Sequence, residues 1–490
     1  MAVEYPIHED FPAERLALLC FPGSMKGSHS TRGQGRGRDV SLAQTPCHGC
    51  QGRPRVTRCP VCFCFIQQSV ELQPGLISFV GCQAEDDQVP LPFLGDVDWL
   101  ARPVAQALMP VSPKIILRKN LGRALRQGHP WIFRDALAEA PALRSGTVVA
   151  VAGRDGRPLA YGYWDCTGPI AVRVLDLQPV GDARALVCDR LRQALTKRLA
   201  RLDRDKTNAF RWVHGEGDRL PGIHVDLYDS AAVVRFDGAG AREFYRNLDS
   251  MLVECSAPLA ISQFVDREQR DGNLAEIEVR ENGIHFVVDL GRGQKGGLFL
   301  DQRENRQAVA GRAHGKSVLN LYGYTGGFSL YAAAAGANHT DTVDIARPAL
   351  ATARRNFQRN GLSLEHAGFH ATDALAFLEQ ATRRGRQWDI VISDPPSFAP
   401  SRRALPKAQS AYFRLHRLAT SVVAPGGLLC AASCSSHFPR DEFLASVERG
   451  AVAAGRSFRL ESLTGAGFDH PVLPAFPEGD YLKFAIGRVD

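Results

Sequence analysis

The stretch Trp388-Asp389-Ile390-Val391-Ile392-Ser393-Asp394-Pro395-Pro396-Ser397-Phe398 decides the fold. Its apolar run predicts a buried strand, and the acidic residue and two prolines that follow predict where that strand stops. A second unit of the same kind lies downstream, where Gly427 to Ala432 is small and apolar and the triplet Ser433-Cys434-Ser435 follows at once. Both polar groups are therefore expected at the carboxyl ends of strands.

The region from residue 291 onward alternates between helical and strand patterns. We expect a helix at about 301–313, a strand over 317–322, a helix at about 327–336, a strand over 339–344, a helix over 348–360 and a short strand ending near Asp373. Alternation of this kind predicts a mostly parallel sheet with right-handed crossovers. In such α/β sheets, ligands bind at the carboxyl ends of the strands.

Asp394 and Cys434 are a pair suited to attack on a pyrimidine ring. A cysteine thiolate can add covalently to an electron-poor carbon, and an aspartic acid can hydrogen-bond or protonate the ring nitrogen that takes up charge. We therefore predict Cys434 as the nucleophile and Asp394 as its partner. The structural alternatives are a small buried residue for Cys434 and a strand-end cap for Asp394. Cys430, within the apolar run, is expected to be ordinary core.

The loop Asn320-Leu321-Tyr322-Gly323-Tyr324-Thr325-Gly326-Gly327-Phe328 joins the first strand of this region to its helix. Its glycines allow a ligand to approach the backbone. A carboxylate at the end of the second strand can accept two hydrogen bonds from a ribose, and one at the end of the third can meet an adenine amino group. The cofactor-binding residues that we predict are Tyr324, Gly326, Gly327, Asp344, Asp373, Asp394 and Gln302.

The same loop discriminates between two nucleoside cofactors. It is not Gly-x-Gly-x-x-Gly, and no other phosphate-cradling sequence is visible. S-adenosylmethionine, which has no phosphate, is therefore favoured over NAD. Gln302 and Arg303 open a helix, where contact with the cofactor or with an RNA phosphate is as well supported as a solvated role.

The length and the charge of the chain limit the number of domains and the kinds of binding partner. The 490 residues are enough for two to four domains. No secretory signal pattern and no apolar run of about 20 residues occurs, which predicts a cytoplasmic protein that does not enter a membrane. The net charge is +7, yet residues 1–113 hold 9 basic and 11 acidic residues, so the excess lies after residue 113. Any electrostatic grip on nucleic acid is expected there.

Four regions follow from these patterns. Residues 1–113 show no sustained periodicity and are expected to be an irregular or disordered extension. Residues 114–180 contain short strands and turns that suit a small β-barrel, residues 181–290 suit an α+β linking domain, and residues 291–490 form the α/β domain. The linking domain should open with a leucine-rich helix whose arginines and lysines are expected to form a solvated basic face rather than an RNA-binding one.

The extension holds two Cys-x-x-Cys pairs, Cys47/Cys50 and Cys59/Cys62. Such pairs can bind zinc, but the gap between them is short and neither is followed by glycine, so we expect no metal site. Met109 lies just before the better-patterned region, and a start assigned too far upstream is one interpretation of the extension.

Taken in order, these motifs resemble the bacterial 23S ribosomal RNA cytosine-5 methyltransferases that carry an N-terminal PUA domain. The resemblance runs from about Lys114 to Val489. Besides the strand-end motifs it includes His129-Pro130-Trp131-Ile132-Phe133, Gly217-Asp218-Arg219-Leu220-Pro221-Gly222, Gly297-Leu298-Phe299-Leu300-Asp301-Gln302-Arg303, Asp469-His470-Pro471 and Pro477-Glu478-Gly479-Asp480-Tyr481-Leu482-Lys483.

The resemblance implies an α/β protein with a PUA RNA-binding barrel, a linking domain and a Rossmann-like methyltransferase domain. It implies transfer of the methyl group of S-adenosylmethionine to carbon 5 of cytosine in 23S ribosomal RNA, with Cys434 adding to carbon 6. Ser397 stands where some other RNA cytosine methyltransferases carry a second cysteine that aids product release. Glu478 or His470 could accept the ring proton, although a structural role is favoured for both, and Phe398 could stack on the target base.

Four alternatives remain open at this stage. Methylation of uridine carbon 5 uses the same cysteine chemistry, whereas guanine-N7 methylation needs no cysteine. A non-catalytic RNA-binding assembly factor would keep the fold alone, and a nucleotide-dependent oxidoreductase lacks its phosphate fingerprint here. A homodimer is also left open.

Overall fold

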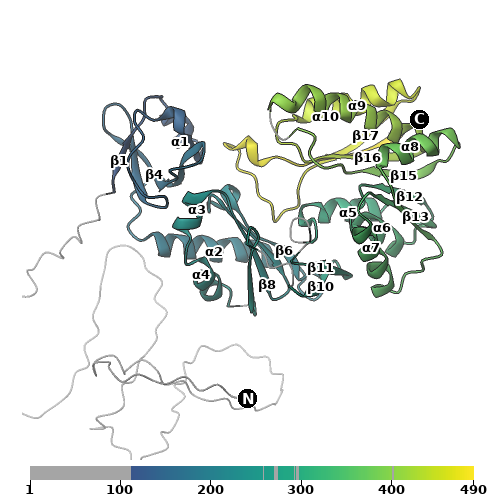
Figure 1. Ribbon diagram of the computed structural model, residues 1–490, viewed down its shortest axis with the longest axis horizontal. Coiled ribbons are helices and arrows are strands. Elements are labelled where there is room, and N and C mark those ends of the chain that lie inside the picture. Colours follow the sequence, from purple (N-terminus) through teal and green to yellow (C-terminus); the bar gives the residue numbers. More distant parts are fainter. Residues whose placement is uncertain (1–111, 258, 270–273, 292, 294–296, 400–401) are drawn as a thin grey trace, which may run out of the picture. The chain divides into compact units, whose positions relative to one another are not determined.

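The structure, a computed structural model, describes residues 112–490 except 258, 270–273, 292, 294–296 and 400–401 (Figure 1). The predictions for residues 1–111, including the Cys47/Cys50 and Cys59/Cys62 pairs, lie outside the described residues. Among the described residues, no helix is both long and apolar enough to cross a membrane.

The first described region is a five-stranded sheet in the order β1-β3-β4-β5-β2. Gly153 and Gly156 form the turn between β3 and β4, where the Gly153 amide donates to the Arg157 carbonyl at 3.0 Å. Apolar side chains of the sheet enclose a small core of their own. The elements are β1 (Lys114–Ile116), α1 (Gly122–Arg126), β2 (Trp131–Phe133), η2 (Arg134–Ala136), β3 (Val148–Ala152), β4 (Pro158–Trp164) and β5 (Ile170–Asp176).

The linking region has a four-stranded sheet, β6-β7-β8-β9, with helices packed against it. A separate hairpin, β10 with β11, packs on helix α7 (Arg347–Arg359) of the next domain and shares a core with it. The elements are α2 (Ala183–Leu199), β6 (Ala209–His214), η3 (Gly215–Asp218), β7 (Ile223–Tyr228), β8 (Ala231–Phe236), α3 (Ala239–Phe244), α4 (Leu248–Cys255), β9 (Gln263–Asp266), β10 (Glu276–Glu281) and β11 (Ile284–Asp289).

Helix α2 corrects the expectation of a solvated basic face at two positions, because Arg192 and Lys197 are exposed but Arg190 and Arg198 are buried. Arg198 is 2% exposed and forms a two-pronged ion pair with Asp218, at 2.6 Å for each oxygen. Arg190 is also buried and reaches Asp176 at 3.1 Å. Periodicity predicts which face of a helix a residue occupies, but it does not predict which carboxylate packs against that face. The expectation of solvent exposure is therefore wrong for these two arginines.

The C-terminal domain is a seven-stranded sheet in the order β14-β13-β12-β15-β16-β18-β17. The first five strands in that order are parallel, and β18 runs antiparallel to both β16 and β17. The strands are β12 (Ser317–Leu321), β13 (His339–Asp344), β14 (Ala367–Ala371), β15 (Trp388–Ser393), β16 (Val423–Ser433), β17 (Phe458–Thr464) and β18 (Lys483–Val489).

Helices cover both faces of this sheet, as Figure 1 shows. Helices α8, α9 and α10 pack on one face and α5 and α6 on the other. The helical elements are η5 (Leu300–Gln302), α5 (Arg303–Ala310), α6 (Gly327–Ala334), α7 (Arg347–Arg359), α8 (Ala374–Arg383), η6 (Arg402–Ala404), α9 (Leu405–Ser421), α10 (Arg440–Ala453) and η7 (Pro477–Gly479). The sheet order reverses at β12, with β13 on one side and β15 on the other, and this is the position where such folds bind ligands.

Candidate active site

The carboxyl ends of β12, β13, β15 and β16 surround one cavity of about 480 Å³. Asp394 follows β15 directly and Cys434 follows β16 directly, and both line the cavity. Asp344 and Asp373 line it as well. The structure therefore brings together four of the strand-end residues that the sequence singled out.

The loop after β12 is wound tightly against the sheet. Tyr322 and Tyr324 both have positive φ, 56° and 48°, a conformation that non-glycine residues seldom adopt. Gly323 lies so close to β13 that an added Cβ would be 2.5 Å from the Cγ2 atom of Thr342. Gly326 has a φ of 82° and precedes the first turn of α6. This strained backbone forms one wall of the cavity.

Asp344 is held in place by backbone amides. Its two carboxylate oxygens accept hydrogen bonds from the amides of Tyr324 and Ala346, each at 2.8 Å. A carboxylate oxygen has further acceptor capacity, so these bonds fix the group without using it up. Asp373 is the N-cap of α8 and accepts from the Ala376 amide at 2.9 Å. Capping and lining the cavity are compatible, because a cap uses one of the two oxygens.

The cavity offers hydrogen-bond acceptors and apolar surface, the two kinds of group that a nucleoside cofactor needs. The buried Asn320 lines it, and the Oδ1 atom of that side chain has no hydrogen-bond partner among the described residues. Asp344 and Asp373 add two carboxylates to the lining, and carboxylate oxygens accept hydrogen bonds from hydroxyl and amino groups. Ile345, 75% exposed, offers apolar surface beside them.

Gln302 contacts Asp394, a contact that the spacing of residues in the sequence did not predict. It is buried at the end of η5 and donates a hydrogen bond from Nε2 to Oδ2 of Asp394 at 3.0 Å. Asn305 in turn donates to Oε1 of Gln302 at 2.6 Å and to the Gly465 carbonyl at 3.1 Å. The orientation of Asp394 is therefore set from the first helix of the domain.

The two cysteines of β16 and its end lie in contrasting environments. Cys430 is fully buried in the core, and burial raises the pKa of its thiol to about 12. Cys434 is only half-buried and lines the cavity, with its Sγ atom 4.0 Å from the Pro395 carbonyl oxygen. The expectation that Cys430 is ordinary core is confirmed, and of the two thiols only that of Cys434 can meet a substrate.

Hydroxyl groups hold the segment that carries Cys434. The Tyr412 hydroxyl lies 2.9 Å from the Ser433 hydroxyl and 3.1 Å from that of Ser435. Ser435 also lies 2.9 Å from the hydroxyl of Ser397, which lines the cavity. Phe398 packs against Tyr412 in the core, with ring centroids 4.8 Å apart. Both sides of Cys434 are thus anchored.

The two candidates for the proton acceptor lie away from the lining of this cavity. His470 is buried and its Nδ1 atom pairs with Asp469 at 2.9 Å. Glu478 lies 3.9 Å from His129 of the first region. Neither residue lines the cavity that contains Cys434.

Two residues near the cavity, Asp301 and Lys483, received no role from the sequence, although both lie in motifs that carry the resemblance. Asp301 lines the cavity and accepts a hydrogen bond from the Tyr481 hydroxyl at 2.6 Å. Lys483 is buried beside the Cys434 segment and donates to the Ser435 carbonyl at 2.7 Å. The one feature of the sequence that could have pointed to Lys483 is its charge at the start of an otherwise apolar strand.

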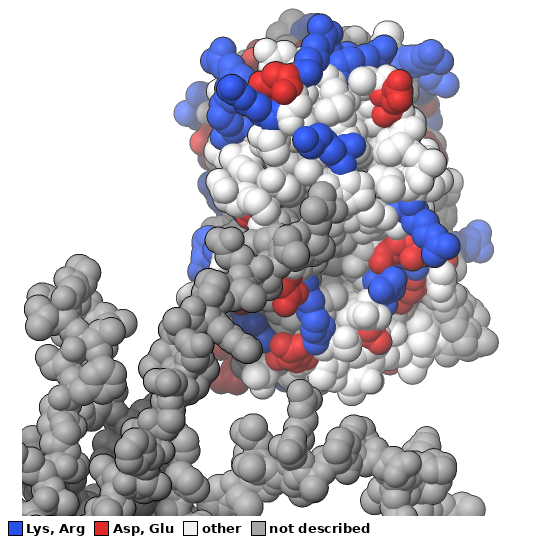
Figure 2. Space-filling view, turned by 90° about the vertical axis from the view of Figure 1, so that its left-hand side faces the viewer, with Lys and Arg blue, Asp and Glu red and all other residues white. Residues whose placement is uncertain are grey.

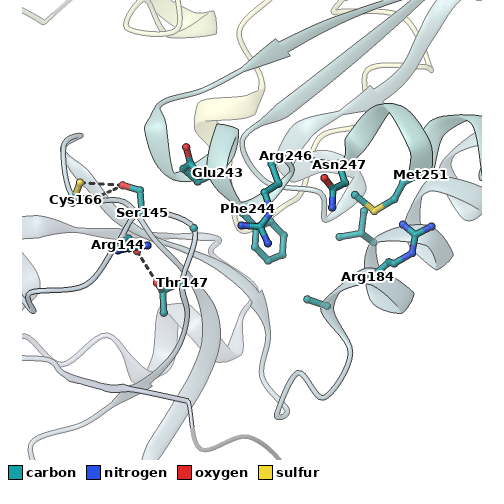
Figure 3. A pocket seen from close by; sticks show the side chains of 13 residues that line it. Arg144, Ser145, Thr147, Cys166, Arg184, Glu243, Phe244, Arg246, Asn247 and Met251 are labelled. Carbon is teal, nitrogen blue, oxygen red and sulfur yellow. Dashed lines mark hydrogen bonds between the residues drawn. The ribbon is translucent and has the colours of Figure 1, made fainter.

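A second cavity, of about 780 Å³, lies where the first region meets the linking region. Figure 3 shows its two walls, with Ser145 and Thr147 on one side and Phe244 and Arg246 on the other. Gly146 allows the walls to approach, since a Cβ there would lie 2.8 Å from Glu243 and Phe244 atoms. Arg144, Arg184 and Arg246 line it together with Asn247.

Comparison with known proteins agrees with this geometry. A family model described as S-adenosylmethionine-dependent methyltransferase matches residues 267–468, and a PUA-like domain model matches residues 115–177. The methyltransferase SMU.776, whose crystal structure is a complex with SAH, superposes with a TM-score of 0.67 at 23% identity, covering 77% of this chain and all of that one. Fold and site thus define an S-adenosylmethionine-dependent methyltransferase with a PUA-like domain.

Curated relatives narrow the family further. "Ribosomal RNA large subunit methyltransferase I" of Shewanella amazonensis is 36% identical over 398 residues, which is 77% of this chain and all of the relative. The protein of the same name from Alteromonas mediterranea is 33% identical over 394 residues, 77% of this chain and 99% of that one. The chain belongs to the ribosomal RNA large subunit methyltransferase I family.

Proposed function

We propose that this enzyme methylates carbon 5 of a cytosine in large-subunit ribosomal RNA through covalent addition of Cys434. The observation that carries the proposal is that Cys434, Asp394 and all the predicted cofactor residues except Gly326 line one cavity. The names of the relatives support ribosomal RNA of the large subunit as the substrate. The proposal goes beyond those names in two respects: the target base is cytosine, and the RNA is the 23S molecule of the bacterial large subunit.

Each residue has a task in this reaction. The Cys434 thiolate attacks carbon 6, and the ring electrons move toward N3. Asp394, oriented by Gln302, hydrogen-bonds that edge of the base and stabilises its charge. S-adenosylmethionine, when bound, supplies the methyl group that carbon 5 receives. Removal of the carbon-5 proton by a base then lets the Cys434 sulfur leave, which restores the aromatic ring.

Asp344, Asp373, Tyr324, Gly326 and Gly327 are proposed to hold the cofactor. The backbone of the loop approaches the ligand closely because it carries glycines at the tight positions. Asp344 accepts from the ribose hydroxyls and Asp373 from the adenine amino group. Gln302 and Asp394 are the proposed cofactor residues nearest the reaction, and we place the methyl group and the target base beside them.

RNA is proposed to dock first on the PUA-like region. Its exposed charged side chains are mostly basic: Lys114, Arg118, Lys119, Arg123, Arg126, Arg144, Arg154 and Arg157, against Asp135, Glu139 and Asp155. Figure 2 shows Lys and Arg side chains gathered in the upper part of one face, with Asp and Glu side chains both among them and lower down. This excess favours a polyanion and predicts affinity that falls with salt. A target base within a helix must also be unpaired or flipped out.

Uridine carbon 5 is the second candidate, because the thiol chemistry is identical. Asp394 distinguishes the two bases: it must donate a proton to N3 of cytosine but accept one from N3–H of uridine. We prefer cytosine because the motifs, in their order along the chain, resemble those of the 23S ribosomal RNA cytosine-5 methyltransferases. The cytoplasmic location and a homodimer remain predictions.

The function is tested by supplying the purified protein and labelled S-adenosylmethionine to large-subunit RNA from cells that lack the gene. Nucleoside analysis should find labelled 5-methylcytosine at one position. Labelled 5-methyluridine or 7-methylguanosine instead would replace the proposal by the corresponding alternative, and no label with intact cofactor binding would favour a non-catalytic role.

A further inference from the structure

Lys483, the first residue of β18, is a charged residue in an unusual place. It is 1% exposed, and its Nζ atom donates to the carbonyl oxygens of Ser435 at 2.7 Å and Tyr481 at 3.0 Å. Lysine is almost never fully buried unless a charge pairs with it. Two carbonyl groups satisfy hydrogen bonds but supply no counter-charge.

The nearby carboxylate already has a partner. Asp480 forms two hydrogen bonds with Arg440, each 2.9 Å long. Burial lowers the pKa of Lys483 to about 8, with Arg440 acting in the same direction, while Asp480 and Cys434 act to raise it. Cys434 is therefore an acidic group close enough to Lys483 to interact with its charge.

The strand register explains this proximity. Lys483 is the antiparallel partner of Ser433, the residue directly before Cys434. The Nζ atom of Lys483 then reaches the carbonyl of Ser435, the residue directly after it. The Tyr412 hydroxyl holds Ser433 and Ser435 from another side. The ammonium group is thus fixed beside the short segment whose middle residue is Cys434.

We propose that Lys483 is a positioning residue whose buried ammonium group serves as the counter-charge of the Cys434 thiolate. The proposal rests on the proposed function, in which Cys434 is the nucleophile. A cation beside a thiol favours the thiolate, and the thiolate in turn favours the buried cation. Each group thereby compensates for the cost of burying the other's charge.

The proton and electron balance is simple. The thiol proton leaves to water when the thiolate forms, and Lys483 keeps its own proton. The Sγ–C6 bond then forms while the electrons of the C5–C6 double bond shift toward N3, beside Asp394. When the Sγ–C6 bond breaks at the end of the cycle, the electron pair returns to sulfur and the ion pair with Lys483 forms again.

Thiol acidity can be measured without methyl transfer. The full-length protein is treated with iodoacetamide over pH 5.5 to 10, and labelling of each cysteine is followed by peptide mass spectrometry. The exposed Cys166 provides an internal reference for reagent reactivity. Tyr412, Asp394, Asp480 and Arg440 are left unchanged throughout, because Tyr412 touches the segment, Asp394 lines the same cavity, and Asp480 and Arg440 act on the charge of Lys483.

In the wild type, the midpoint of Cys434 labelling should lie at least one pH unit below the ~8.5 of an ordinary thiol. Lys483→Met should raise that midpoint by a unit or more and slow labelling at pH 7 about tenfold, whereas Lys483→Arg should restore most of the rate. Lys316→Met is the matched control, because Lys316 directly precedes β12 and so lies at the opposite edge of the same sheet. That control should leave the midpoint unchanged.

A wild-type midpoint at 8.5 or above would overturn the proposal, even if Lys483→Met failed to fold. An unchanged midpoint in folded Lys483→Met would overturn it as well, since a purely structural lysine predicts that result. Failure of the proposed function would look different: a low midpoint at Cys434 together with no covalent adduct on RNA.

Discussion

The side-chain amide of Gln302 donates to the carboxylate of Asp394 across 3.0 Å, joining the start of α5 to the end of β15. Asn305 fixes Gln302 in turn, so Asp394 is oriented before any base arrives. A hydrogen bond to a charged group contributes about 1.5–3 kcal/mol. Gln302→Ala should therefore lower the rate of methylation about tenfold or more with little change in the melting temperature.

Steady-state kinetics with saturating cofactor check this prediction. Asp394→Asn is the companion variant and should lose far more activity, because it removes the group that Gln302 positions. Equal rates for Gln302→Ala and the wild type would mean that Asp394 needs no such support.

Asp344 should determine cofactor affinity. Its carboxylate is proposed to accept charge-assisted hydrogen bonds from ribose, and it also anchors the amide of Tyr324. Asp344→Ala should weaken binding of S-adenosylmethionine by about 1.5–3 kcal/mol in calorimetry. Asp389→Ala is the control, since Asp389 binds Ser317 at the opposite edge of the sheet. An affinity unchanged by Asp344→Ala would remove the proposed ribose position.

The second cavity should contribute to RNA binding rather than to chemistry. Arg144 and Arg246 line it and neither forms an ion pair with another described residue, whereas Arg184 pairs with Glu254. The double variant Arg144→Ala/Arg246→Ala should reduce the salt slope of filter binding by about 1.4 for single-stranded RNA. Arg383→Ala/Arg459→Ala, which removes two exposed arginines from the C-terminal domain, is the charge-matched control. A slope equal to that of the wild type would place the phosphate contacts elsewhere.

Acid should destabilise the protein partly through His416. This residue is fully buried in α9, and burial lowers its pKa to about 4. The unfolded chain then binds more protons below pH 6.5, so stability is present above that pH and is lost as the pH falls. His416 alone should remove about 1 kcal/mol of unfolding free energy between pH 7.5 and pH 5.5.

Urea unfolding at the two pH values measures that loss. His416→Gln should show a pH dependence smaller by about 1 kcal/mol, whatever its absolute stability. The exposed His366→Gln serves as the control. If both variants lost the same amount on acidification as the wild type, the buried imidazole would not be the source.

Sequence patterns located the strand ends well because each depends on neighbouring residues. The apolar runs before Asp394 and Cys434 predicted where β15 and β16 stop, the alternation of strands and helices predicted β13 up to Asp344, and parallel connection brings those ends to one edge. The contrast between Cys430 and Cys434 followed from the same local pattern.

Contacts between distant segments could not be predicted in the same way. Gln302 meets Asp394, and Lys483 meets Ser435, only because α5 and β18 pack beside strands far away in the chain. Burial of Arg198 depends on Asp218 in the same manner. Hydrophobic periodicity carries no information on which polar side chain stands opposite, so ion pairs and second-layer hydrogen bonds required the structure.

The most direct test of the account is a covalent bond between Cys434 and its substrate. Large-subunit RNA that contains 5-fluorocytidine should trap the enzyme in the presence of S-adenosylmethionine, because fluorine at carbon 5 cannot be removed as a proton. The account predicts a denaturant-stable protein–RNA adduct that maps to Cys434 and is absent from Cys434→Ser. A Cys434→Ser enzyme that methylates RNA at the wild-type rate, with no adduct in either protein, would contradict it.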